Sequence, residues 1–86
     1  MYRYEEVKPR LFCDEGQRMF LRVRDCVRNR LSSAGAVRME EAISNAGGGD
    51  SWELLACVDR LVELGEIREI PQEKVPGQYR VFVKAE

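Results

Sequence analysis

Apolar residues recur three and four positions apart through the first long stretch of the chain, and this spacing predicts a helix from Asp14 to Ser33. The acidic residues Asp14 and Glu15 suit the positive end of the helix dipole. Ser32-Ser33-Ala34-Gly35 then ends the helix. At 100° per residue, the apolar side chains fall within an arc of about 140° and should form its buried face: Met19, Phe20, Val23, Cys26, Val27 and Leu31.

A second, shorter helix is predicted from Met39 to Ala46, because its apolar residues are again three and four positions apart. Val37, just before it, is interpreted as a strand of one or two residues. The three glycines at 47–49 accept positive φ without steric cost, and they therefore end the helix.

A third helix is predicted from Ser51 to Leu64. Asp50 has the character of an N-cap, and Glu53 three positions later completes a variant of the capping box. Gly65 follows as the residue that leaves the helix with positive φ. The predicted buried stripe consists of Leu54, Leu55, Val58, Leu61 and Val62.

After Gly65 the spacing of apolar residues approaches strict alternation, which is typical of strands. Residues 66–70 form one predicted strand and residues 78–84 a second, with Tyr79, Val81 and Val83 on one side. The intervening loop contains Pro76-Gly77, which suits the centre of a type II turn. The chain is therefore expected to end in a β-hairpin.

This order of elements resembles that of a winged-helix domain, a helix-turn-helix followed by a β-hairpin. Residues 58–67 (VDRLVELGEI) are similar to the L-x-x-L-x-x-x-G-x-I ending of many winged-helix recognition helices, with Val58 at the first Leu position. The resemblance covers residues 14–84. It implies an α+β fold with three helices and a C-terminal wing in a single domain at residues 14–86, after an N-terminal arm at residues 1–13.

The charge of the third helix opposes the DNA binding that the resemblance implies. In winged-helix proteins this helix commonly lies in the major groove, and the wing contacts phosphates. Residues 50–66 carry five acidic residues and one basic residue, a net charge of −4, whereas affinity for DNA comes mainly from Lys and Arg that neutralise phosphates. The face predicted to point outward carries Trp52, Glu53, Ala56, Asp59, Arg60 and Glu63.

A winged-helix DNA-binding regulator would therefore need an atypical docking mode. Its candidate phosphate contacts are Arg18, Arg22, Arg28, Arg60, Lys74 and Arg80. Charge is also unevenly spread, because residues 1–33 carry a net charge of +3 and residues 34–86 a net charge of −4. This asymmetry could steer two copies of the chain toward each other.

The composition of the 86 residues excludes several kinds of chemistry. The chain has no histidine, so Ser-His-Asp and Cys-His nucleophile pairs and mixed Cys/His zinc sites are excluded. Its three cysteines have no CxxC spacing, so neither a disulfide framework nor a four-cysteine zinc site forms within the chain. We interpret Cys26 and Cys57 as small apolar residues on helix faces and Cys13 as an exposed thiol. We expect no catalytic residue, cofactor or metal.

Targeting signals are not evident in the pattern. No apolar run approaches the ~18 residues of a transmembrane helix, and residues 1–6 lack the apolar core of a signal peptide. The expected location is therefore the cytoplasm, without membrane contact.

Two exposed apolar features offer better clues to function. Trp52 lies about 120° from the centre of the predicted stripe and either folds back to cap the core or anchors a partner. Leu21 lies outside the apolar arc of the first helix. Either the N-terminal arm covers Leu21, or both belong to an interface. The apolar residues of the arm are Tyr2, Tyr4, Val7, Leu11 and Phe12.

These observations predict a non-catalytic interaction module that binds a protein partner or forms a homodimer. The candidate interface residues are Leu21 on the first helix and, on the third, Trp52, Glu53, Ala56, Arg60 and Glu63. The alternative is a winged-helix transcriptional regulator that binds DNA.

Overall fold

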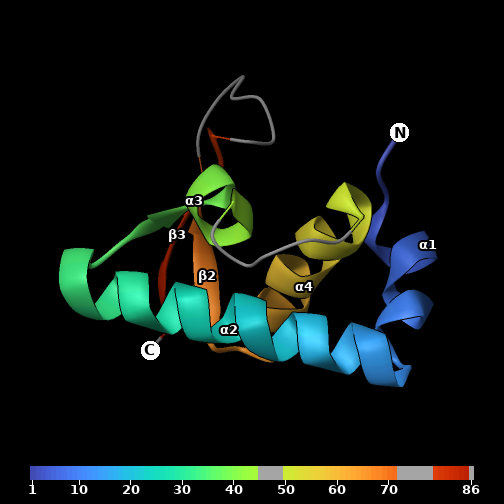
Figure 1. Cartoon of the computed structure of the whole chain (residues 1–86). Helices are drawn as coiled ribbons and strands as arrows, with labels where there is room; N and C mark the ends of the chain where they lie inside the picture. Colours follow the sequence, from blue (N-terminus) through green and yellow to red (C-terminus); the bar gives the residue numbers. More distant parts are fainter. Residues whose placement is uncertain (45–49, 72–78, 86) are drawn as a thin grey trace.

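The computed structural model describes residues 1–44, 50–71 and 79–85, and it confirms the predicted α+β fold (Figure 1). The described residues form α1 (Tyr4–Val7), a 3-10 helix η1 (Lys8–Leu11), α2 (Asp14–Ala34), β1 (Val37–Arg38), α3 (Met39–Ser44), α4 (Ser51–Glu63), β2 (Ile67–Ile70) and β3 (Val81–Lys84).

Helix α2 is the longest element and follows the predicted bounds to within one residue. The Sγ of Cys13 caps its N-terminus by accepting a hydrogen bond from the backbone N–H of Gly16 at 3.4 Å. Gly35 ends it with φ 79°, a conformation that glycine adopts without strain. Met19, Val23 and Val27 are buried, and Phe20, Cys26 and Leu31 pack partly against the same core, which confirms the predicted arc.

Helix α4 begins at the predicted N-cap. Oδ1 of Asp50 accepts hydrogen bonds from the backbone N–H groups of Trp52 at 2.8 Å and Glu53 at 3.3 Å. The helix ends at Glu63, one residue before the predicted end, and Gly65 takes φ 79° as expected. The predicted stripe faces the core, and the fully buried Cys57 lies beside it.

The three strands form one antiparallel sheet in the order β1-β3-β2. In its centre, β3 pairs with β1 through Val37↔Phe82 and with β2 through Ile67↔Lys84. β2 begins one residue later than predicted and β3 begins at Val81, with Phe82 facing the core. The glycine run at 47–49 and the Pro-Gly turn lie outside the described residues, as do Ala46 and Gln78.

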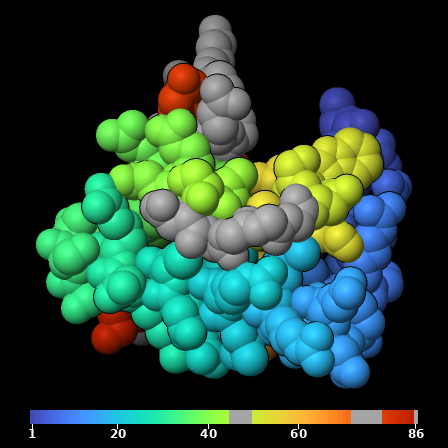
Figure 2. All heavy atoms as spheres, viewed as in Figure 1, coloured from blue at the N-terminus to red at the C-terminus, as the bar shows by residue number. Residues whose placement is uncertain are grey.

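The N-terminal arm is helical and packs against α4 and the first turns of α2 (Figures 1 and 2). Val7 and Leu11 are core residues. The arm meets α2 at Gly16, where an added Cβ would lie 2.6 Å from backbone atoms of Arg10 and Leu11. Of the two alternatives for Leu21, cover by the arm is wrong, because the arm packs mainly against α4 and leaves the Leu21 side chain 43 % exposed.

Candidate interaction surfaces

The outward side of α4 was expected to be open, but the N-terminal arm covers much of it. The centre of this contact is Glu63. Its Oε1 accepts a hydrogen bond from the Tyr4 hydroxyl at 2.7 Å, and its Oε2 accepts one from Lys8 Nζ at 2.9 Å. Nη1 of Arg60 approaches Oε1 to 2.7 Å. Hydrogen bonds from Lys8, Tyr4 and Arg60 lower the pKa of Glu63 to about 2.

Asp59, one turn earlier, joins the arm to the sheet. Its Oδ2 accepts a hydrogen bond from the Tyr2 hydroxyl at 2.6 Å, and its Oδ1 accepts one from Arg80 Nη2 at 2.8 Å. Arg80 also donates to Glu69 on β2, at 2.8 and 3.0 Å. Burial and the hydrogen bond to Asp59 raise the pKa of the Tyr2 hydroxyl well above its ordinary value, so it remains a donor at neutral pH.

The expected contact face of α4 is therefore only partly available. Ala56 is fully buried, so its assignment to an exposed face is wrong. The physical reason is that α1 and η1 pack on α4, on a second side of that helix. Arg60 and Glu63 hold the arm, and Glu53 is half-buried. Trp52 remains 41 % exposed, with its ring edge-on to Tyr2 at 6.5 Å between centroids.

Two further large apolar side chains, Phe12 and Leu64, are exposed. The sequence pattern did not predict that they form a common surface. Phe12 is 56 % exposed and Leu64 is 50 % exposed. They line a hollow of about 150 Å³ beside Gln17 and Phe20, and the Arg60 guanidinium lies 5.4 Å from the centre of the Phe12 ring. Leu64 follows Leu61 by three residues, so the apolar stripe of α4 continues to the surface at its C-terminal end.

A larger groove of about 490 Å³ lies between the C-terminal half of α2 and the sheet. Its apolar lining is Val27 and Leu31 from α2, Leu61 from α4 and Ile67 from β2. Arg24, Arg28, Lys84 and Glu66 supply its charged groups. We call this cavity the α2–β2 groove. No local sequence pattern predicts it, because its walls come from four separate elements.

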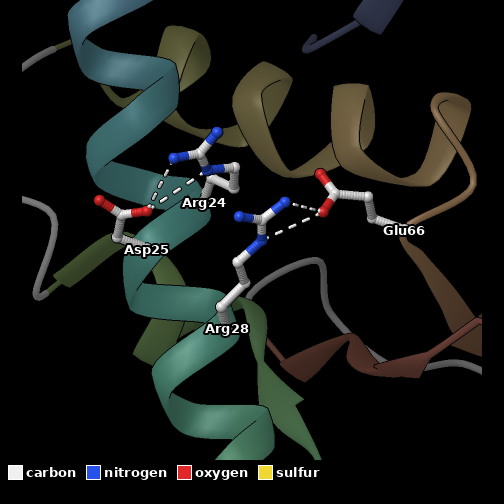
Figure 3. Close-up of polar contacts among 4 residues, drawn as sticks. All are labelled: Arg24, Asp25, Arg28 and Glu66. Atoms are coloured by element: carbon white, nitrogen blue, oxygen red, sulfur yellow. Dashed lines mark hydrogen bonds and ion pairs between the residues drawn. The ribbon is translucent and has the colours of Figure 1, made fainter.

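The guanidinium groups of Arg24 and Arg28 project from successive turns of α2 (Figure 3). Both Nε and Nη2 of Arg28 contact Oε1 of Glu66, and those of Arg24 contact Oδ1 of Asp25 at 3.3 and 3.1 Å. Within the described residues, Lys84 has no ion-pair partner, and Nη1 of each arginine is likewise unbonded. The groove therefore combines an apolar lining with unused cationic donors.

Three of the candidate phosphate contacts form ion pairs with acidic residues of the same molecule. Arg28 pairs with Glu66, Arg60 with Glu63, and Arg80 with Asp59 and Glu69. Arg18 and Arg22 are exposed on α2, whereas Lys74 lies outside the described residues. Three of these cations are therefore already neutralised within the molecule.

Cys57 lies fully buried on α4. Burial raises the pKa of Cys57 to about 12, so its thiol stays protonated near neutral pH. No group of three or more potential metal ligands occurs among these residues. None of the described helices is both long enough and apolar enough to cross a membrane.

The chain matches no protein-family model, no curated protein and no solved structure. The class defined by its own geometry is a small α+β domain with a three-stranded antiparallel sheet, an arrangement compatible with a winged helix.

Proposed function

We propose that this protein is a non-catalytic interaction module of winged-helix type, which binds a protein partner or another copy of itself. The observation that carries the proposal is the packing of α1 and η1 on the outward side of α4. In the winged-helix arrangement this helix would be the DNA-reading one. Here the side of α4 that would enter the DNA major groove is occupied by Tyr2, Tyr4 and Lys8 of the arm.

The charge of α4 supports the same conclusion. Removing the arm would uncover the acidic residues Asp59 and Glu63. Helix α4 would therefore present no basic surface to phosphates, whether the arm is docked or removed. The arginine of α4, Arg60, is already paired with Glu63. The arm-covered side of α4 therefore lacks the electrostatic attraction on which DNA binding depends.

Exposed apolar side chains remain on other parts of the surface and suit a protein partner. Trp52 stands at the N-terminal end of α4, and tryptophan is enriched at binding hot spots. Leu21 shares one side of α2 with Gln17 and Arg24, because positions three and four apart lie together. That side of α2 connects the Phe12–Leu64 hollow with the α2–β2 groove.

Titration of a labelled mixed-sequence duplex, followed by fluorescence anisotropy at about 50 and 200 mM salt, tests this proposal. We expect no binding at either salt concentration. The DNA-binding alternative would use Arg18, Arg22 and the wing. Binding that weakens steeply with salt and is lost in Arg18→Glu would overturn the proposal in favour of that alternative. Ser33→Glu, which adds a negative charge elsewhere on α2, is the matched control.

A further inference from the structure

The two ends of α4 carry complementary surfaces. At its N-terminal end, the exposed Trp52 ring is flanked by Asp50 and Glu53. Asp50 uses Oδ1 to cap the helix, and neither carboxylate has an ion-pair partner among the described residues. This end therefore presents an aromatic side chain between two acidic groups, which we call the Trp52 knob.

Near the C-terminal end of α4, the α2–β2 groove presents the opposite character. Leu61 contributes to its apolar lining, while Arg24, Arg28 and Lys84 surround that lining with positive charge. Arg28 is paired with Glu66 and Arg24 with Asp25, so in the described part of the chain the positive charge left to the groove is that of Lys84, with the unbonded Nη1 group of each arginine as a further donor. The groove, at about 490 Å³, falls within the ~300–1,000 Å³ range of cavities that enclose a bound group.

The knob of one molecule is placed away from its own groove. Trp52 and Leu61 are nine residues apart, which corresponds to about 14 Å along the helix axis. A second copy can satisfy both surfaces, because the acidic groups of its knob match the cations of the groove, and its indole can contact Leu31, the partly exposed residue of the apolar lining. Charge complementarity of this kind steers association and fixes orientation.

We propose that copies of this protein associate head to tail, with the Trp52 knob of one copy seated in the α2–β2 groove of the next. The proposal rests on the proposed function and names its partner. Such an interface is heterologous, because two different surfaces meet, so association continues until a ring closes or a filament grows. The contact is expected to weaken as salt screens the charges.

The single tryptophan of the chain gives a direct measurement. As protein concentration rises from micromolar to millimolar, sedimentation velocity should show growing species, and Trp52 emission should shift to shorter wavelength as the indole leaves water. Trp52→Ala should weaken association roughly thirtyfold or more, the scale of a binding hot spot. A wild-type protein that stays monomeric with unchanged emission over this range overturns the proposal.

A second variant blocks the groove without touching the knob. Ser32 lines the groove, so Ser32→Phe should fill it and prevent association. Ser33→Phe is the matched control, because Ser33 is also exposed on the last turn of α2 but lines a different hollow beside Cys26 and Glu41. Association of Ser32→Phe as strongly as Ser33→Phe contradicts the assignment of the groove. The circular dichroism spectrum and melting temperature of each variant establish that it is folded.

Mixing the two defective variants gives the sharpest result. Trp52→Ala retains an intact groove, and Ser32→Phe retains an intact knob. Each should be monomeric alone, whereas an equimolar mixture should form dimers that grow no further, with blue-shifted Trp52 emission. A mixture that stays monomeric overturns head-to-tail association. Because duplex binding is measured separately, this failure would leave the proposed interaction function standing.

Discussion

Helix α4 and its N-cap carry two pairs of acidic residues, and the two pairs differ in their hydrogen-bond and ion-pair partners. Asp59 and Glu63 accept hydrogen bonds from Tyr2, Tyr4, Lys8 and Arg80 and so fasten the arm and the sheet to the helix. Asp50 and Glu53, at the other end, have no basic partner in the described residues.

The net negative charge of this helix therefore has two causes. One pair of carboxylates stabilises the fold, because its charges are satisfied within the molecule. The other pair has no ion-pair partner and flanks the exposed Trp52. A charge count along the sequence treats all four carboxylates as equal. The structure distinguishes the pair that stabilises the fold from the pair that remains available for contact with another molecule.

The largest expected effect comes from breaking the contact that brings the arm to α4. Gly16→Ala places a Cβ 2.6 Å from backbone atoms of Arg10 and Leu11, so η1 or α2 must shift. We expect a loss of about 3 kcal/mol in unfolding free energy. Urea denaturation followed by circular dichroism measures it.

Gly35→Ala is the matched control for this substitution. An added Cβ at Gly35 meets nothing within 4 Å, and only its φ of 79° is unfavourable. That strain costs about 1 kcal/mol. An equal effect of the two substitutions would show that the arm does not dock tightly at Gly16.

The next effect separates the two pairs of carboxylates directly. Asp59→Asn weakens the contacts with the Tyr2 hydroxyl and the Arg80 guanidinium, both of which are partly buried. We expect a loss of about 2 kcal/mol, because partners are left with poorer hydrogen bonds. Glu53→Gln on the same helix should change stability by less than about 0.5 kcal/mol. Similar losses in the two variants would remove the distinction between the pairs.

A smaller effect is expected from Trp52. Trp52→Ala removes a ring that is 41 % exposed and has one edge-on contact with Tyr2, so unfolding free energy should fall by about 1 kcal/mol. Leu54→Ala, which removes a buried side chain two residues later, should cost about 3 kcal/mol. Thermal denaturation compares them. An equal loss would place Trp52 in the core rather than on a contact surface.

Local signals explain why α2 and α4 could be predicted to within one residue. Apolar periodicity, the Asp50 cap and the glycines at 35 and 65 act within a few residues of each helix end, so the sequence pattern contains them directly. β1 lies at Val37, where a strand of one or two residues was predicted. Its partner β3 begins later than the alternation of Tyr79, Val81 and Val83 indicates.

The covered side of α4 could not be predicted in this way, because it depends on contacts between distant residues. A helical projection assumes one buried side, and it therefore left Ala56 exposed. The small side chains of Gly16 and Ala56 were the available signal, since such positions permit close approach of another element. The α2–β2 groove could not be predicted from the sequence either. Lys84 reaches it only because the hairpin register places β3 beside Ile67.

The smallest effect concerns Glu63, whose ion pairs are solvent-exposed and therefore weak. Its folded-state pKa of about 2 lies below the ordinary value of 4.5, so its charged form stabilises the fold at and above pH 4.5. This stabilisation is lost as the pH falls from about 4.5 to about 2. Wild-type protein should therefore be more stable than Glu63→Gln at pH 6, and the difference should vanish toward pH 2. A Glu63→Gln difference that persists unchanged to pH 2 would mean that the side chain holds the arm by packing rather than by its charge.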